Sequence, residues 1–129
     1  MEEARDAYAK QRYDLAVFLA EQALQLYLKA QLLRVLGDYP RTHSIRQLLV
    51  MLSRALGGDA EKEIVEFMGR ERPRLSELED VCIASRYGLR IYTREDAEDI
   101  LSTVERVVAL VEELLRRASR NNAGEKPLA

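Results

Sequence analysis

The sequence has one cysteine, Cys82, and one histidine, His43, among 129 residues. A lone cysteine excludes a disulfide within the chain, and one cysteine with one histidine cannot make a Cys/His zinc site. The sequence also lacks a phosphate-binding glycine loop, a paired-histidine metal motif, a nucleophile elbow and a dinucleotide fingerprint. We therefore expect neither a bound metal ion nor a cofactor.

An excess of charge of one sign is also missing. The chain carries 20 basic and 22 acidic side chains, a net charge of −2. Proteins that coat nucleic-acid backbones usually carry a clear basic excess, so general DNA or RNA binding is disfavoured, although a local basic site is not. No apolar run reaches the roughly 18 residues of a membrane span, and the acidic N-terminus lacks the apolar core of a signal peptide. We expect a cytoplasmic protein.

Three prolines and six glycines are the main interruptions, and the stretches between them have helical periodicity. The pattern predicts an all-α, antiparallel up-and-down bundle of four to five helices. The expected helices cover residues 2–36, with a break near Arg12-Tyr13, then 44–56, 59–69, 76–86 and 93–119. Residues 1–119 form the predicted domain, and residues 120–129 form a predicted flexible tail because they have no apolar period.

Local signals set the expected helix boundaries. Gly37 and Pro40 stop the first region. Ser44 begins an S-x-x-Q capping box, Asp59 is an expected N-cap, and a second capping box is expected at Ser76 after Pro73 has interrupted the preceding helix.

The segment 15–36 has apolar residues on two opposite sides of a helical wheel. One face contains Leu15, Phe18, Leu19, Leu26, Ala30, Leu33 and Leu36, and the other contains Val17, Leu24, Leu28, Leu32 and Val35. Such a helix either lies at the centre of its own bundle or shares one face with another subunit. For a domain of this size we predict a homodimer, with a fully internal helix as the alternative.

Gln22 and Lys29 fall in the middle of the first apolar face, seven residues apart. Burying an unpaired ammonium is costly. The Lys29 side chain therefore either extends along apolar surface to reach solvent, or takes part in an ion pair or an anion site between helices.

Two further positions are candidates for anion binding. His43 and Arg41 stand just before the helix that begins at Ser44, where free N–H groups and the helix dipole favour anions. Arg86 continues the apolar line of Leu78 and Cys82, so its guanidinium could pair with a carboxylate or a phosphate. The alternatives are structural: His43 closes its loop by hydrogen bonding, and Arg86 caps its own helix.

Three segments resemble the HEPN domain family. Ala20-Glu21-Gln22-Ala23 followed by Lys29-Ala30 is similar to the family's A-E-Q-A-x(5)-K-A signature. Thr42-His43-Ser44 with Leu48-Leu49 resembles its T-H-S/D-L-x-x-L-L segment, and Ala84-Ser85-Arg86-Tyr87 with Thr93 to Ala97 resembles its A-R-Y-P segment and last helix. They occur in the family's order over about residues 12–115.

The resemblance implies a helical bundle, commonly a homodimer, that binds a nucleotide. It also implies a minimal nucleotidyltransferase partner, in toxin–antitoxin-like or related two-component systems. The family-typical polar residues are Gln22, Lys29, His43, Arg86 and Tyr87, so the candidate ligand-binding set with Arg41 has six members.

Ribonuclease activity is disfavoured. The ribonuclease branch of the family uses an R-x(4–6)-H motif, but the only histidine is preceded at the relevant positions by Leu36, Gly37 and Asp38. Three functions remain open: a ligand-binding dimer, a structural interaction module without ligand, and, least favoured, a ribonuclease that uses His43.

Overall fold

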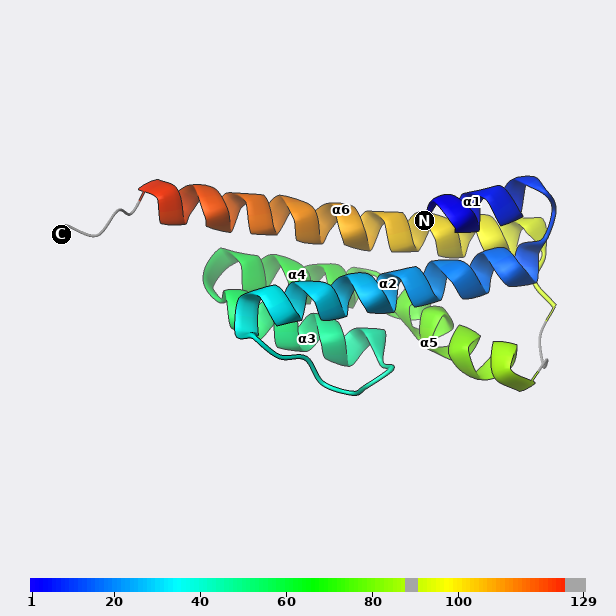
Figure 1. The fold of residues 1–129 in the computed structure, drawn as a ribbon, viewed down its shortest axis with the longest axis horizontal. Helices are drawn as coiled ribbons and strands as arrows, with labels where there is room; N and C mark the ends of the chain where they lie inside the picture. Colours follow the sequence, from blue (N-terminus) through cyan, green and yellow to red (C-terminus); the bar gives the residue numbers. More distant parts are fainter. Residues whose placement is uncertain (88–90, 125–129) are drawn as a thin grey trace.

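The computed structural model describes residues 1–87 and 91–124, with the side chains of residues 1–81 and 91–120. These residues form six helices and no strand (Figure 1). The helices are α1 (Glu2–Ala9), α2 (Tyr13–Leu36), α3 (Ile45–Leu56), α4 (Gly58–Arg70), α5 (Arg72–Tyr87) and α6 (Arg94–Gly124). The all-helical bundle is confirmed. The described helices number six because the first region is divided at Gln11, which adopts a positive φ of 62°.

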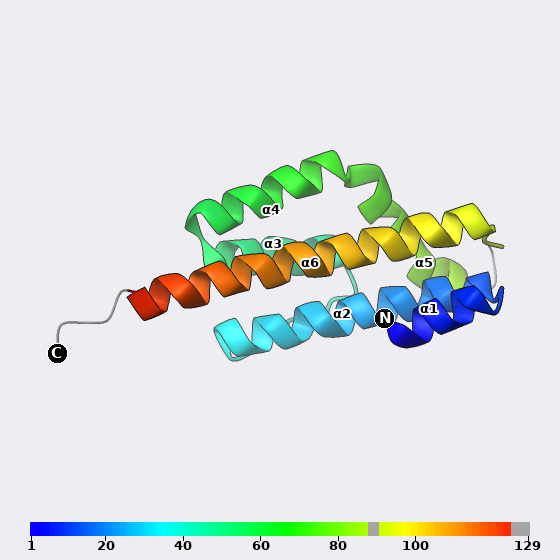
Figure 2. The same cartoon turned by 90° about the horizontal axis from the view of Figure 1, so that it is seen from above.

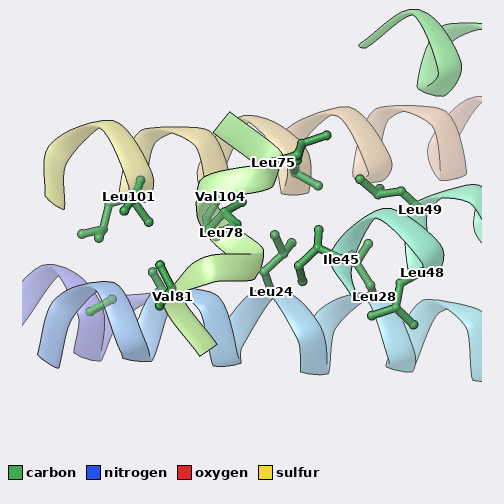
Figure 3. Packing of buried hydrophobic residues seen from close by; sticks show 14 of the residues in the cluster. Leu24, Leu28, Ile45, Leu48, Leu49, Leu75, Leu78, Val81, Leu101 and Val104 are labelled. Carbon is green, nitrogen blue, oxygen red and sulfur yellow. The ribbon is translucent and has the colours of Figure 1, made fainter. Parts of the chain in front are cut away.

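Helix α2 is the central element of the bundle. It packs against α1, α3, α5 and α6, and Figure 2 shows it beside the long α6. Its inward residues Leu24 and Leu28 meet Ile45 of α3, with α5 and α6 closing the same core (Figure 3). Burying each of these side chains contributes about 1.5–3 kcal/mol, so this contact region stabilises the packing of α2 against α3.

The order of helix directions is not strictly up-and-down. Residues 37–44 return along α2 as an extended segment, so α3 runs in the same direction as α2 (Figure 1). The contact between His43, just before α3, and Gln25, in the middle of α2, fits this return. The segment therefore carries His43 from the C-terminal end of α2 back to its centre.

Helix α2 ends as its sequence predicts. Gly37 has a left-handed φ of 78° and donates its N–H to the carbonyl of Leu33. Glycine adopts this conformation without the steric penalty of a Cβ atom, which is why the helix stops there.

The fourth helix begins within one residue of its predicted start, but the predicted N-cap at Asp59 is wrong. Helix α4 begins at Gly58, and Gly57 with a φ of 63° is its N-cap residue. Asp59 lies inside the first turn and makes no capping hydrogen bond, although its charge still favours the helix dipole.

The predicted start of the fifth helix at Ser76 is also wrong. Helix α5 begins at Arg72, so Ser76 lies inside it. Pro73 occupies the first turn, where the missing N–H would have had no helical partner in any case. The proline therefore opens this helix and does not interrupt one.

The last helix begins where expected and continues further. Thr93 and Asp96 form a reciprocal cap: Asp96 N–H donates to Thr93 Oγ1 at 3.1 Å, and Thr93 N–H donates to Asp96 Oδ2 at 3.2 Å. The helix passes Ser119 and ends at Gly124, so part of the predicted tail is helical, and residues 125–129 lie outside the described residues. None of the helices in the described part is long and apolar enough to cross a membrane.

Candidate functional site

One side of α2 is apolar and uncovered. Leu26, Leu33 and Leu15 on this side expose 69%, 48% and 42% of their surfaces, and Phe18 and Leu36 are exposed as well. Gln22 and Lys29 are half-buried in the same stripe, as the helical wheel predicts. We call this set of seven residues the outward face of α2.

A buried carboxylate lies beside the outward face. The side chain of Glu21 is fully buried and accepts hydrogen bonds at both oxygens, from Gln22 Nε2 at 2.7 Å and from Gln25 Nε2. Burial raises the pKa of Glu21, while the two amide donors and the charges of His43 and Lys29 oppose that rise. Lys29 and His43 are therefore both near this carboxylate. We call Glu21, Gln22, Gln25, Lys29 and His43 the Glu21 cluster.

Hydrogen bonds within the cluster determine which nitrogen of the His43 ring carries a proton. Gln25 presents its NH₂ group to Glu21, so the Gln25 oxygen faces His43 Nδ1 at a distance of 3.2 Å. An amide oxygen only accepts hydrogen bonds, and Nδ1 must therefore carry a proton. In the neutral ring Nε2 is then an acceptor. Glu21 and Gln25 together orient His43 with Nε2 as its remaining hydrogen-bonding atom.

The N-terminus of α3 is filled by an internal carboxylate. Glu79 of α5 accepts from Ser44 Oγ at 2.6 Å, from the Arg46 backbone N–H at 3.1 Å and from the Arg46 guanidinium at 2.6 Å. Burial would raise the pKa of Glu79, but these hydrogen bonds and the charge of Arg46 outweigh burial and lower it. Glu79 thus occupies the position where an anion was expected beside His43 and Arg41.

The predicted capping box at Ser44 forms in one direction. Ser44 Oγ accepts the N–H of Gln47 at 3.2 Å. The reciprocal contact is replaced, because Ser44 N–H donates to Thr42 Oγ1 and the Thr42 hydroxyl donates to the side-chain oxygen of Gln47. This network fixes the loop that holds His43.

The structure brings together only some of the predicted site residues. Gln22 hydrogen-bonds to Glu21, and Lys29 and His43 are close enough for their charges to act on it. Arg41 is exposed and has no hydrogen bond or ion pair in the described part of the chain. Arg86 and Tyr87 form the end of α5, and their side chains lie outside the described residues.

Sequence reasoning missed Glu21, Gln25 and Glu79. Glu21 and Gln25 are four residues apart on the inward side of the helix, near its border with the outward face, which is a detectable signal for a hydrogen-bonded polar pair. The local sequence marks Glu79 only as the acidic residue of the capping box expected at Ser76, because its true partners, Ser44 and Arg46, are more than thirty residues away.

The chemistry available at the Glu21 cluster is binding. It offers a cation at Lys29, the Nε2 atom of His43, which accepts when the ring is neutral, and the amide oxygen of Gln22. Within residues 1–81 and 91–120 no group of three or more histidine, cysteine, aspartate or glutamate side chains is placed to hold a metal ion.

Comparison with known families identifies the family. Residues 1–114 match the family model described as HEPN domain, which covers most of the chain. No curated protein and no solved structure gives a significant match.

Proposed function

Because the chain belongs to the HEPN domain family, we propose that it is a cytoplasmic, dimeric binding module that holds a nucleotide or a phosphate-type anion. It acts with a minimal nucleotidyltransferase partner in a toxin–antitoxin-like or related two-component system. The observation that carries the proposal is the outward face of α2, with the Glu21 cluster at its edge.

The outward face is symmetric along the helix, which favours a second copy of the chain as its occupant. Leu15 and Leu36, Phe18 and Leu33, and Gln22 and Lys29 are placed at equal distances on either side of the midpoint between Gln25 and Leu26. In a two-fold interface, residue i meets residue j and residue j meets residue i. Two α2 helices packed antiparallel about this midpoint therefore pair every apolar residue with an apolar one.

The same arrangement supplies partners for the polar residues. Gln22 uses its NH₂ group on Glu21, which leaves its oxygen as an acceptor. In the antiparallel pair that oxygen faces Lys29 of the second copy, and an ammonium donates to an amide oxygen. Two Gln22–Lys29 contacts then fix the register at the centre of the interface.

The ligand chemistry follows from the charges near Glu21. The buried carboxylate disfavours a bare phosphate close to it. Lys29 gives one of its three N–H donors to Gln22 of the second copy and keeps two donors and its charge for a phosphate. His43 Nε2 accepts from an amino or hydroxyl group. A nucleotide carries both kinds of group, with a phosphate for Lys29 and base or ribose donors for His43.

Disulfide cross-linking tests the dimer and its register together. In a chain with Cys82→Ser, we expect Leu26→Cys to cross-link two copies, because these positions are about 1.5 Å apart along the helix axis. Leu33→Cys is the matched control, since its two copies would be separated by about 22 Å along the axis. A mixture of Phe18→Cys and Leu33→Cys chains should cross-link again. A chain that light scattering shows to be monomeric at micromolar concentration contradicts the proposal.

Calorimetry with ATP and GTP, with and without Mg²⁺, tests the ligand. We expect Lys29→Met to weaken binding about tenfold or more, the loss of one charge-assisted contact. Lys10→Met changes an exposed lysine directly after α1 and should leave affinity unchanged. Absence of heat and of thermal stabilisation at millimolar nucleotide argues against a nucleotide site.

A second candidate is a structural interaction module without ligand. The observation in its favour is that Glu21, Gln22, Gln25 and His43 already hydrogen-bond to one another, and that Glu79 fills the N-terminus of α3. Under this alternative the dimer still forms, but Lys29→Met lowers its stability and no nucleotide binds.

A further inference from the structure

A second site lies on another flank of α2, between its C-terminal half and α6. This α2/α6 groove has a volume of about 380 Å³. Its hydrogen-bonding residues are Tyr27, Gln31 and Arg34 from α2, and Glu112, Arg116 and Ser119 from α6. Tyr27 follows Leu26 by one residue and so points about 100° away from it around the helix. The groove therefore lies outside the outward face.

The α2 side of the groove has hydrogen-bond donors without partners. The Tyr27 hydroxyl is buried and has no hydrogen-bond partner in the described part of the chain. Burial, with the charge of Glu112, raises the pKa of Tyr27 to about 12, so the hydroxyl keeps its proton at neutral pH. A buried donor without an acceptor is unfavourable, and a ligand that supplies an acceptor would satisfy it.

Gln31 is oriented as a second donor. It is only 9% exposed, and its oxygen accepts from Arg34 Nη1 at 3.3 Å. The Gln31 NH₂ group is then left with no hydrogen bond to residues 1–81 or 91–120. Both Tyr27 and Gln31 thus offer donors where no protein acceptor meets them.

The groove also contains two cationic groups. Arg34 has no carboxylate partner among the described side chains, and Arg116 is paired through one nitrogen with Glu113 at 2.8 Å. A guanidinium has five N–H donors, so both side chains keep free donors. Glu112 is the one carboxylate in the lining. Donors and positive charge exceed acceptors, which favours an anion.

From these residues we propose that the α2/α6 groove binds a small molecule through an oxyanion group, a phosphate ester or a carboxylate. Arg34 and Arg116 neutralise the charge of this group, and Tyr27 and Gln31 donate hydrogen bonds to it. Ser119 and Arg116 belong to the part of α6 beyond residue 114, where the HEPN match ends. The groove is therefore partly built by an element that the family match does not include.

Titration by NMR at constant ionic strength, with inorganic phosphate and with citrate as separate probes, tests this site. We expect saturable shifts at Tyr27, the Gln31 side-chain amide and Arg34. Saturation by phosphate alone identifies a phosphate ligand, and saturation by citrate alone identifies a carboxylate ligand. Absence of saturation with both probes overturns the proposal.

Matched substitutions distinguish binding in the groove from non-specific binding of an anion to surface charge. Arg34→Gln should weaken binding about tenfold, while Arg54→Gln, on the exposed side of α3, should leave it unchanged. Tyr27→Phe should weaken binding without lowering the melting temperature, because it removes a buried hydroxyl that has no partner. Equal losses in Arg34→Gln and Arg54→Gln would overturn the site.

The groove is also separable from the Glu21 cluster. Lys29→Met removes a cation from the cluster and none from the groove, so it should leave the phosphate or citrate shifts intact. A loss of these shifts in Lys29→Met would assign them to the cluster and reject the groove.

Discussion

The two sides of α2 have similar residues and different surroundings. On the inward side Val17, Leu24, Leu28 and Leu32 are fully buried, whereas on the outward side Leu26 and Leu33 are exposed. Both sides are rich in leucine, so side-chain hydrophobicity does not distinguish them. The neighbours do, because α1, α3, α5 and α6 all pack around the rest of the helix and leave the outward face uncovered.

Because the two sides have different neighbours, leucine has a different role on each side of α2. Inward leucines stabilise the fold of one chain, and outward leucines are available to a second chain. The polar residues Glu21 and Gln25 are buried on the inward side, close to its border with the outward face, and hydrogen bonds within the Glu21 cluster satisfy them. Substitutions on each side and at the border should therefore have separable effects.

The largest effect is expected on the inward side. Leu28→Ala removes a fully buried side chain and should lower the free energy of unfolding by about 2–5 kcal/mol, because it loses apolar burial and leaves a cavity. Urea denaturation measures this change. Leu26→Ala, one of the outward leucines, should change the unfolding free energy of the monomer by less than about 0.5 kcal/mol. Equal losses for both variants would contradict the distinction between the two sides.

A charge on the outward side should act on association. Leu26→Asp places a carboxylate at the centre of the proposed interface and should weaken dimerisation about 100-fold, equivalent to about 2.7 kcal/mol, by burying an unpaired charge. Sedimentation equilibrium measures the dissociation constant, and circular dichroism checks that helicity is retained. Val65→Asp alters an exposed apolar residue on α4 and is the control. A Leu26→Asp chain that dimerises normally would show that the copies meet elsewhere.

The hydrogen bonds of Glu79 that join α5 to the start of α3 should also stabilise the inward side of the bundle. Glu79→Ala removes the carboxylate that holds the Ser44 hydroxyl and the Arg46 backbone, so we expect a loss of about 1–3 kcal/mol in unfolding free energy. Glu77→Ala breaks only a pair with half-exposed Arg74 and should cost less than about 1 kcal/mol. Thermal or urea unfolding compares them. A smaller loss at Glu79 than at Glu77 would show that the link to α3 contributes little.

Much of the fold could be predicted because helical periodicity and capping are local. The stop at Gly37, the cap at Ser44 and the start at Thr93 all depend on residues within a few positions. The errors at Asp59 and Ser76 arose where two local signals competed, and the backbone conformation of Gly57 and the tolerance of Pro73 in a first turn decided the outcome.

The site was less predictable because its partners are distant in sequence. The wheel placed Gln22 and Lys29 correctly in the outward face, but it could not show that Glu21 is buried within range of the charges of His43 and Lys29. Nor could it show that Glu79 occupies the N-terminus of α3. These facts depend on the return of residues 37–44 along α2, which periodicity does not encode.

The smallest expected effect concerns the buried carboxylate at the border. Because burial raises the pKa of Glu21, the folded chain holds this proton more tightly than the unfolded chain does. The bound proton therefore adds to the free energy of unfolding at low pH. This stabilisation is lost as pH rises from the ordinary glutamate pKa of about 4.3 through the raised pKa of the folded chain.

Glu21→Gln removes this titration. As pH falls from about 7.5 toward about 4.5, the wild-type chain should gain unfolding free energy relative to Glu21→Gln. Urea unfolding over the series measures the difference, with Glu66→Gln as an exposed control on α4. The nitrogen shifts of the His43 ring give a second measurement. The amide introduced by Glu21→Gln both donates and accepts, so Gln25 can face it with either end of its own amide. The Gln25 oxygen is then no longer held toward His43 Nδ1, and the tautomer with a proton on Nδ1 is no longer favoured. A wild-type chain that loses stability relative to Glu21→Gln over the same range would show that the folded chain favours the ionised carboxylate, and Lys29 and His43 would then outweigh its burial.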